Sequence, residues 1–333
     1  MILDFFCQRG IKRFVFIFVC LAALFWQKII AVGVPCPTNS IISADNFLYS
    51  IADINIYWIA AIKLTLLLTC SYSFIIILSV NDVLPNRKYL AVLLFWTIVS
   101  VFADSQNFVN SLIALLFQLF AFYNIFCIYH SDAIKSSIFI AAFFVGISSM
   151  FSLSFILSSI NIVVALLIFH VVQWRYIISI IAGLLTPFVF LLCFFQLAYH
   201  DINLMWQLIE NSFNESILIS FDNFAMLTTI FTGFVFLVGF FSIFKITSLK
   251  RTKSVYRMTN QLFYFIFFTS AIIFVALYGM QSYAITMFGI SSAYLITRFS
   301  QITKRTWLIE LIIFILLFAA IAYCNYSVLG LAI

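Results

Sequence analysis

The sequence predicts an all-α fold, a polytopic transmembrane helical bundle of ten or eleven spans with the N-terminus inside and the C-terminus outside. Three observations lead to this prediction. Of the 333 residues, 65% are apolar and only 8% are charged, and the mean hydropathy is +1.18; a soluble domain carries about 25% charged residues. The apolar residues form long runs, and every second loop between those runs contains no Lys or Arg.

Eleven apolar runs are candidate spans, because a helix needs about 17–25 apolar residues to cross a bilayer. They lie near 14–34, 57–80, 89–103, 108–129, 137–152, 154–172, 177–199, 223–245, 262–280, 283–297 and 307–328. Three pairs form continuous stretches, 89–129, 137–172 and 262–297. A single helix of about 36 residues would be about 54 Å long, far more than a hydrocarbon core of about 30 Å. Each stretch is therefore expected to turn back, as two tight spans or as a re-entrant hairpin.

The first run, 14–34, is predicted to be a retained transmembrane helix. It follows Arg9, Lys12 and Arg13, as the apolar core of a signal peptide would. A signal-peptide core, however, has only about 7–15 residues and ends at a small-residue cleavage site. This run is longer, contains Lys28, and has no convincing cleavage motif. Cleavage remains the alternative.

The loop charges set the orientation. With the N-terminus inside and alternating spans, the inner segments collect 15 of the 17 basic residues, and the outer segments hold no Lys or Arg. This follows the positive-inside rule. We expect one transmembrane domain, 1–333, in a bacterial inner (cytoplasmic) membrane, with a first outer loop at 35–56 and a basic inner loop at 245–261. The pI of about 8.9 reflects this topology, and no nucleic-acid partner is expected.

Lys28 and Lys63 are the two basic residues inside predicted spans, and such residues are functional candidates. Each lies about six residues from the outer end of its helix, so both are about 9 Å below the outer surface. Asp45, Asp53 and Asp104 lie in the adjacent outer segments. These positions allow the two cations and up to three carboxylates to gather at one outer-facing functional site. The preferred interpretation is that the lysines snorkel to the headgroups or form structural ion pairs, with a functional site as the alternative.

Two other segments interrupt the apolar pattern. The segment from 148 to 159 carries six serines, and small polar residues favour close helix packing, with a polar path as the alternative; they are Ser148, Ser149, Ser152, Ser154, Ser158 and Ser159. The segment 200–222 has apolar residues at helical spacing, which predicts an outer interfacial helix. Pro187, inside a predicted span, predicts a kink.

The familiar catalytic and metal-binding motifs are absent from the sequence. There is no phosphate-binding glycine loop, no G-x-S-x-G and no H-E-x-x-H. The three histidines are scattered and no metal site is expected. The seven cysteines have no C-x-x-C spacing, so a disulfide framework is not expected either. No cofactor is assigned.

The stretch Asn110–Phe190, with short spans and a G-I-S-S segment at Gly146–Ser149, resembles an uncharacterised family of bacterial multi-spanning membrane proteins. It is similar, more distantly, to the membrane module of polyprenyl-phosphate-dependent (C-type) glycosyltransferases. That resemblance implies that an acidic residue of the first outer loop, Asp45 or Asp53, acts as a base or helps to bind a metal. Those enzymes hold the lipid phosphate with basic residues on the outer side.

The outer loops of this chain carry no basic residue, so the resemblance assigns the phosphate to Lys28 and Lys63, supported by Asp104. Three functions stay open. The first, slightly favoured by the positions of the loop aspartates, is glycosyltransferase-like handling of a polyprenyl-phosphate-linked sugar at the outer face. The second is a transporter or flippase. The third is a non-catalytic subunit or scaffold of an envelope complex. The expected partners are membrane lipids, a polyprenyl-phosphate lipid and other membrane proteins.

Overall fold

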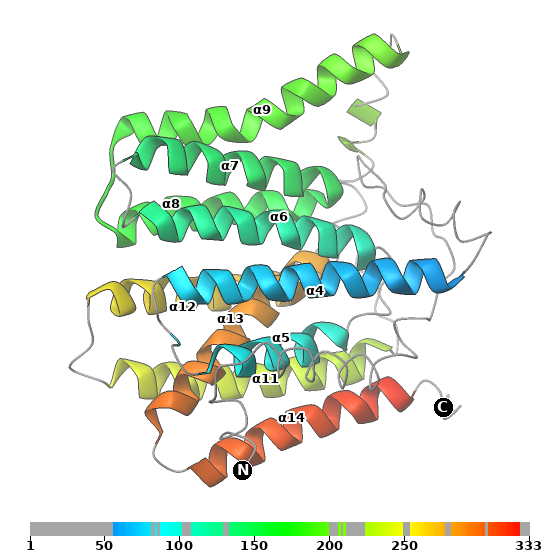
Figure 1. Cartoon of the computed structure of the whole chain (residues 1–333), viewed down its shortest axis with the longest axis vertical. Coiled ribbons are helices and arrows are strands. Elements are labelled where there is room, and N and C mark those ends of the chain that lie inside the picture. Colours follow the sequence, from blue (N-terminus) through cyan, green and yellow to red (C-terminus); the bar gives the residue numbers. More distant parts are fainter. Residues whose placement is uncertain are drawn as a thin grey trace.

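The computed structural model describes residues 56–80, 84, 87–101, 108–128, 133–199, 206–207, 209–210, 224–248, 254–276, 281–303 and 306–326. In these ranges all regular structure is helical (Figure 1). The helices are α4 (Ile56–Val80), α5 (Lys88–Ser100), α6 (Phe108–Cys127), α7 (Ile134–Phe151), the 3-10 helix η2 (Leu153–Ser158), α8 (Ser159–Ile168), α9 (Trp174–Tyr199), α11 (Phe224–Thr247), α12 (Ser254–Ala276), α13 (Gln281–Ile302) and α14 (Thr306–Tyr326).

The predicted all-helical fold is confirmed for these residues. The first predicted span, 14–34, lies outside them, and each of the other ten predicted runs coincides with a helix. All three long apolar stretches break into two helices, as expected from their length. Five helices are long and apolar enough to cross a membrane: Ala60–Val80, Val109–Cys127, Ile134–Phe151, Trp174–Leu197 and Ile230–Thr247. Shorter apolar helices occur at Lys88–Val99, Leu153–Ile168 and Trp307–Ile321.

Two helices extend beyond the apolar runs that predicted them. Helix α12 begins at Ser254, eight residues before the predicted run, and α11 continues to Thr247, so part of the 245–261 segment is helical. Hydropathy locates the lipid-buried part of a helix, whereas backbone hydrogen bonding continues into the polar region beside it. Of the 200–222 segment, the structure describes only residues 206, 207, 209 and 210, all four helical.

The helices are stacked as a series of neighbours, with α9 at one extreme and α14 at the other (Figure 1). Helix α9 packs on α7, α7 on α6, and α6 on α4. Helix α13 contacts α5, α11 and α12 and reaches α6 as well, so it joins the two halves of the chain. Helix α14 packs on α5 and α11.

The centre of the bundle is α13. Every side chain from residue 286 to residue 297 is buried. Its buried serine and threonine hydroxyls bond within the same helix: the hydroxyl of Ser291 donates to the carbonyl of Met287 (2.9 Å), and that of Thr297 donates to the carbonyl of Ala293 (2.7 Å). Small residues with internally satisfied hydroxyls allow neighbouring helices to approach closely.

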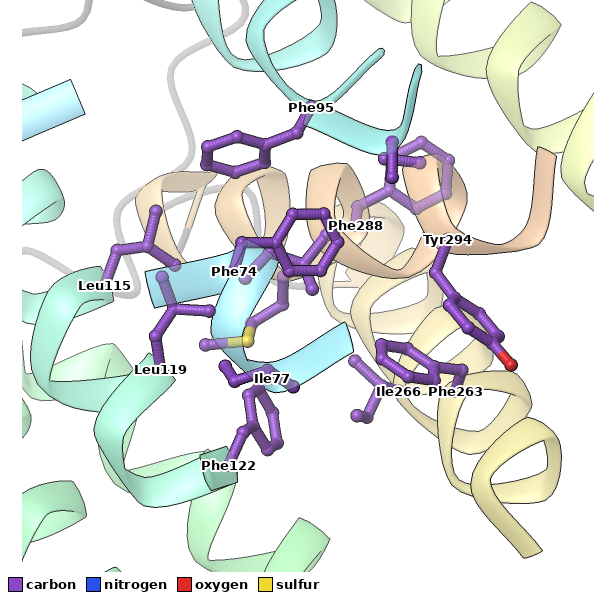
Figure 2. Close-up of a cluster of buried hydrophobic side chains, with 14 of the residues drawn as sticks. Phe74, Ile77, Phe95, Leu115, Leu119, Phe122, Phe263, Ile266, Phe288 and Tyr294 are labelled. Atoms are coloured by element: carbon purple, nitrogen blue, oxygen red, sulfur yellow. The ribbon is translucent and has the colours of Figure 1, made fainter. Parts of the chain in front are cut away.

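Aromatic rings fill the space around this helix, as Figure 2 shows. Phe263 of α12 stacks on Tyr294 of α13 with ring centroids 3.9 Å apart, and Phe74 of α4 contacts Phe95 of α5 with centroids 5.7 Å apart. The buried hydroxyl of Tyr294 donates to the side-chain carbonyl of Asn260. A buried tyrosine hydroxyl needs such an acceptor.

Helix α9 is held on α7 through two glycines. A Cβ atom at Gly183 would lie 2.7 Å from the carbonyl oxygen of Phe139 and 2.8 Å from the Cβ of Ala142. A Cβ atom at Gly146 would lie 2.8 Å from the ring of Pro187. The two helices therefore approach too closely at these points for any side chain, which is a common way of holding transmembrane helices together.

Gly183→Ala is expected to lower the free energy of unfolding by about 1–3 kcal/mol, because the added methyl group meets backbone atoms that cannot move aside. The matched control is Gly233→Ala on α11, where a Cβ atom has nothing within 4 Å. That change should alter stability by at most about 1 kcal/mol. The measurement is the thermal midpoint in detergent micelles. Equal midpoints for the two variants would contradict the close contact.

Candidate functional site

The hairpin between α7 and α8 contains an interruption built from serines. Helix α7 ends at Phe151, and Ser152 adopts an extended conformation with φ −152° and ψ 113°. The chain then forms the 3-10 helix η2 before α8 begins at Ser159. Serine side chains compete for backbone hydrogen bonds and so weaken a regular helix. The serine-rich segment is thus both a packing element and a break in the helical backbone.

Gln118 of α6 joins this hairpin from the facing helix. Its side-chain carbonyl oxygen Oε1 accepts a hydrogen bond from the hydroxyl of Ser158 (2.8 Å) and lies 3.5 Å from that of Ser148. Each hydroxyl is also within hydrogen-bonding distance of a carbonyl in its own helix. The hydroxyl of Ser148 lies 2.8 Å from the carbonyl oxygen of Val145, and that of Ser158 lies 2.6 Å from the carbonyl oxygen of Phe155. A hydroxyl has one proton, so each serine shares it between two acceptors.

Two amide donors at this point have no acceptor among the residues that the structure describes. They are Nε2 of Gln118 and Nδ2 of Asn161, and both atoms are buried. Asn161 follows Ser158 by three residues, which places the two side chains on the same face of the chain. We refer to Gln118, Ser148, Ser158 and Asn161 as the amide–serine cluster. All four side chains are at most 1% exposed.

The cluster lies deep in the bundle. Gln118 is ten residues from the first residue of α6, which corresponds to about 15 Å along the helix, or about half of a hydrocarbon core of about 30 Å. Ser148 is only three residues from the end of α7, about 4.5 Å. The tip of the α7–α8 hairpin is therefore about 10 Å deeper than the start of α6.

Among the residues proposed for the outer site, the structure describes only Lys63. Lys28, Asp45, Asp53 and Asp104 lie outside the described ranges. The side chain of Lys63 is 7% exposed. It belongs to the buried stripe of α4 formed by Ala60, Lys63, Leu67, Cys70 and Phe74, which recurs at helical spacing. Lys63 thus faces the interior of the bundle, and a lipid-facing lysine that snorkels does not fit this position.

The depth of Lys63 follows from its neighbours. The thiol of Cys70, seven residues later, lies 3.5 Å from the carbonyl of Leu112 in the second turn of α6. Helices α4 and α6 run in the same direction, because α5, the helix between them in the sequence, runs back the opposite way (Figure 1). Seven residues span about 10 Å. Lys63 is therefore about level with the start of α6, at one end of the bundle and well separated along the axis from Gln118.

The predicted packing role of the serines involves residues that were not predicted. Ser148 and Ser158 do pack between helices, in line with the preferred interpretation, but they do so around Gln118, which was not among the predicted site residues. Asn161 was missed as well. The signal available in the sequence was that Gln118 is a polar residue in the middle of a predicted span, where polar residues are expensive.

The cluster can bind but carries no acid or base. Its groups are amides and hydroxyls, and within the described residues no group of three His, Cys, Asp or Glu side chains could hold a metal ion. Comparison of the chain with known protein families, with characterised proteins and with solved structures found no match.

Gln118→Met is expected to change the free energy of unfolding by less than about 1 kcal/mol, because the net value of such hydrogen bonds is small and each serine keeps a carbonyl of its own helix. The adjacent Leu119→Ala, in the core shown in Figure 2, should cost about 2–5 kcal/mol. Chemical or thermal unfolding in detergent measures both. If Gln118→Met lowered the free energy of unfolding as much as Leu119→Ala, the cluster would serve to hold the helices together and would not be a functional site.

Proposed function

We propose that this protein is a bacterial inner-membrane protein that handles a polyprenyl-phosphate-linked sugar at its outer face, in the manner of a glycosyltransferase. In this proposal the chain crosses the membrane ten or eleven times, with the N-terminus inside and the C-terminus outside. The observation that carries the proposal is the burial of Lys63 inside the bundle, at the end where α6 begins.

A buried lysine near one end of a membrane bundle suits a lipid phosphate. Charged side chains within spans face the bundle interior and mark substrate or ion pathways. The ammonium group is a compact point charge that binds phosphate. At the level of the start of α6, the charge lies near the depth of lipid headgroups, where the phosphate of a long isoprenoid chain would also lie. The prenyl chain itself would remain in the surrounding lipid.

The proposed chemistry is a transfer of the sugar to an acceptor hydroxyl. Asp53 or Asp45 would remove the hydroxyl proton or help to hold a metal, and the acceptor oxygen would then attack the anomeric carbon. The bond between that carbon and the phosphate oxygen would break, with polyprenyl phosphate as the leaving group. Lys63, together with Lys28, would stabilise the phosphate charge, and Asp104 would orient the lysines.

Lys63→Met should remove the bound lipid. We expect the protein purified in native-lipid discs to be enriched in a polyprenyl-phosphate species over bulk phospholipid, and the enrichment to fall at least about tenfold in Lys63→Met, the size of effect given by about 1.4 kcal/mol of binding free energy. Lys63→Arg should keep part of it, since the charge is retained. Lys245→Met, an exposed lysine at the end of α11, is the control. Lipid mass spectrometry measures all four proteins.

Bulk phospholipid alone in every sample would contradict the proposal and favour the scaffold alternative, for which co-purifying membrane proteins are the expected finding. Gel filtration of Lys63→Met in detergent shows whether a lost lipid reflects a lost fold.

Asp53→Asn should leave lipid binding intact and stop the transfer, because the amide cannot accept the proton. The bound lipid should then shift from free polyprenyl phosphate toward the sugar-linked form, which the same mass spectra resolve. An unchanged ratio in both Asp53→Asn and Asp45→Asn would exclude these residues as bases. It would favour a flippase, an alternative that the interrupted α7–α8 hairpin also supports, because transporters use broken helices at their binding sites.

A further inference from the structure

We propose that the amide–serine cluster is a binding site for a small uncharged molecule that presents a hydroxyl oxygen, with water as its smallest occupant. The site is formed by Gln118 of α6, Ser148 of α7, Ser158 of η2 and Asn161 of α8. It is separate from the end of the bundle that carries Lys63 and does not depend on the proposed lipid specificity.

Two buried amide donors determine the chemistry of the ligand. Nε2 of Gln118 and Nδ2 of Asn161 are buried and have no acceptor among the described residues. A buried donor without an acceptor costs about 1–3 kcal/mol, and lipid supplies no compensating partner. Ser158 bonds to Gln118 and lies one turn before Asn161, so both amide side chains are neighbours of Ser158. A hydroxyl oxygen placed there accepts from the amides and can donate to a serine oxygen.

The surrounding charges exclude an ionic occupant. The helices around the cluster are α6, α7, α8, α9, α12 and α13. Their described basic residues are Lys135, Arg175, Arg257 and Arg298, each within the first or last five residues of its helix. Their described residues include no Asp or Glu. A buried ion without a counter-charge is strongly unfavourable. The ligand is therefore neutral.

The irregular backbone beside the cluster is also consistent with a binding site. Irregular backbone at membrane depth is tolerated where it is buried in protein or lines a polar cavity. Here the interruption from Ser152 to Ser158 adjoins the unsatisfied amides, with the hairpin tip about 10 Å and Gln118 about 15 Å below the start of α6.

Access of a small hydroxylated reagent tests the proposal. The probe is hydroxyethyl methanethiosulfonate, which is neutral and modifies only the thiolate form of cysteine. A thiol in apolar surroundings is inert, whereas a hydrated one ionises and reacts. The variants are Ser158→Cys at the end of η2 and, as the matched control, Ala165→Cys, which is seven residues later and buried in α8. Intact mass spectrometry follows the additional adduct of each variant relative to the parent protein.

Ser158→Cys is expected to react at least about tenfold faster than Ala165→Cys, and Gln118→Met added to Ser158→Cys should slow the reaction, because the amide no longer holds water. Ser148→Cys, on the other side of the hairpin, replaces Ser158→Cys if that variant does not fold. Equal, slow labelling at residues 158, 148 and 165 would overturn the proposal. The Gln118 amide would then be rotated by 180°, with its nitrogen on Ser158 and its oxygen accepting from Asn161 in a dry network. Equal, fast labelling would overturn it too, since the reagent would be entering through general opening of the bundle.

Discussion

Lipid offers the backbone no hydrogen-bond partner, and this constraint governs the whole structure. Each span must satisfy its own amides, so the described part of the chain is built from helices. Because lipid tails are as apolar as the side chains, burial of apolar area contributes little to helix association, and close packing must hold the bundle together. Helix α13 meets this requirement with small residues and hydroxyls bonded within the helix. Gly183 and Gly146 do the same between α7 and α9.

Hydropathy alone predicted the positions of the helices well. Apolar runs located ten helices, and the length of the three long stretches correctly required a turn in each. The positions of helix ends were less accurate, as α12 shows, because helical hydrogen bonding does not stop where the apolar residues stop. The serines at 148 and 158 were recognised as an interruption, but the partner that organises them, Gln118, comes from another helix and is not near them in the sequence.

Which face of each helix is buried could not be predicted. Helices that are apolar all round have no polar stripe to orient them, so the sequence left open whether Lys63 faced lipid or protein. The structure decides this through the stripe that Lys63 shares with Leu67 and Cys70. The two kinds of polar feature are now distinct: the buried cation Lys63 near one end of the bundle, and a neutral set of buried amides and hydroxyls near its middle.

The contacts of α13 also bear on the order in which the protein assembles. Helices α4, α6, α7 and α9 pack mainly on one another and lie close together in the chain, so they can associate as they leave the ribosome. Helix α5, buried on all sides from Leu90 to Val99, obtains its cover from α13, almost 200 residues later. Until about residue 302 has been inserted, α5 must be held by lipid or by an insertion factor. Completion of the core is thus a late event in biogenesis, and a chain that stops before α13 would leave the centre of the bundle open.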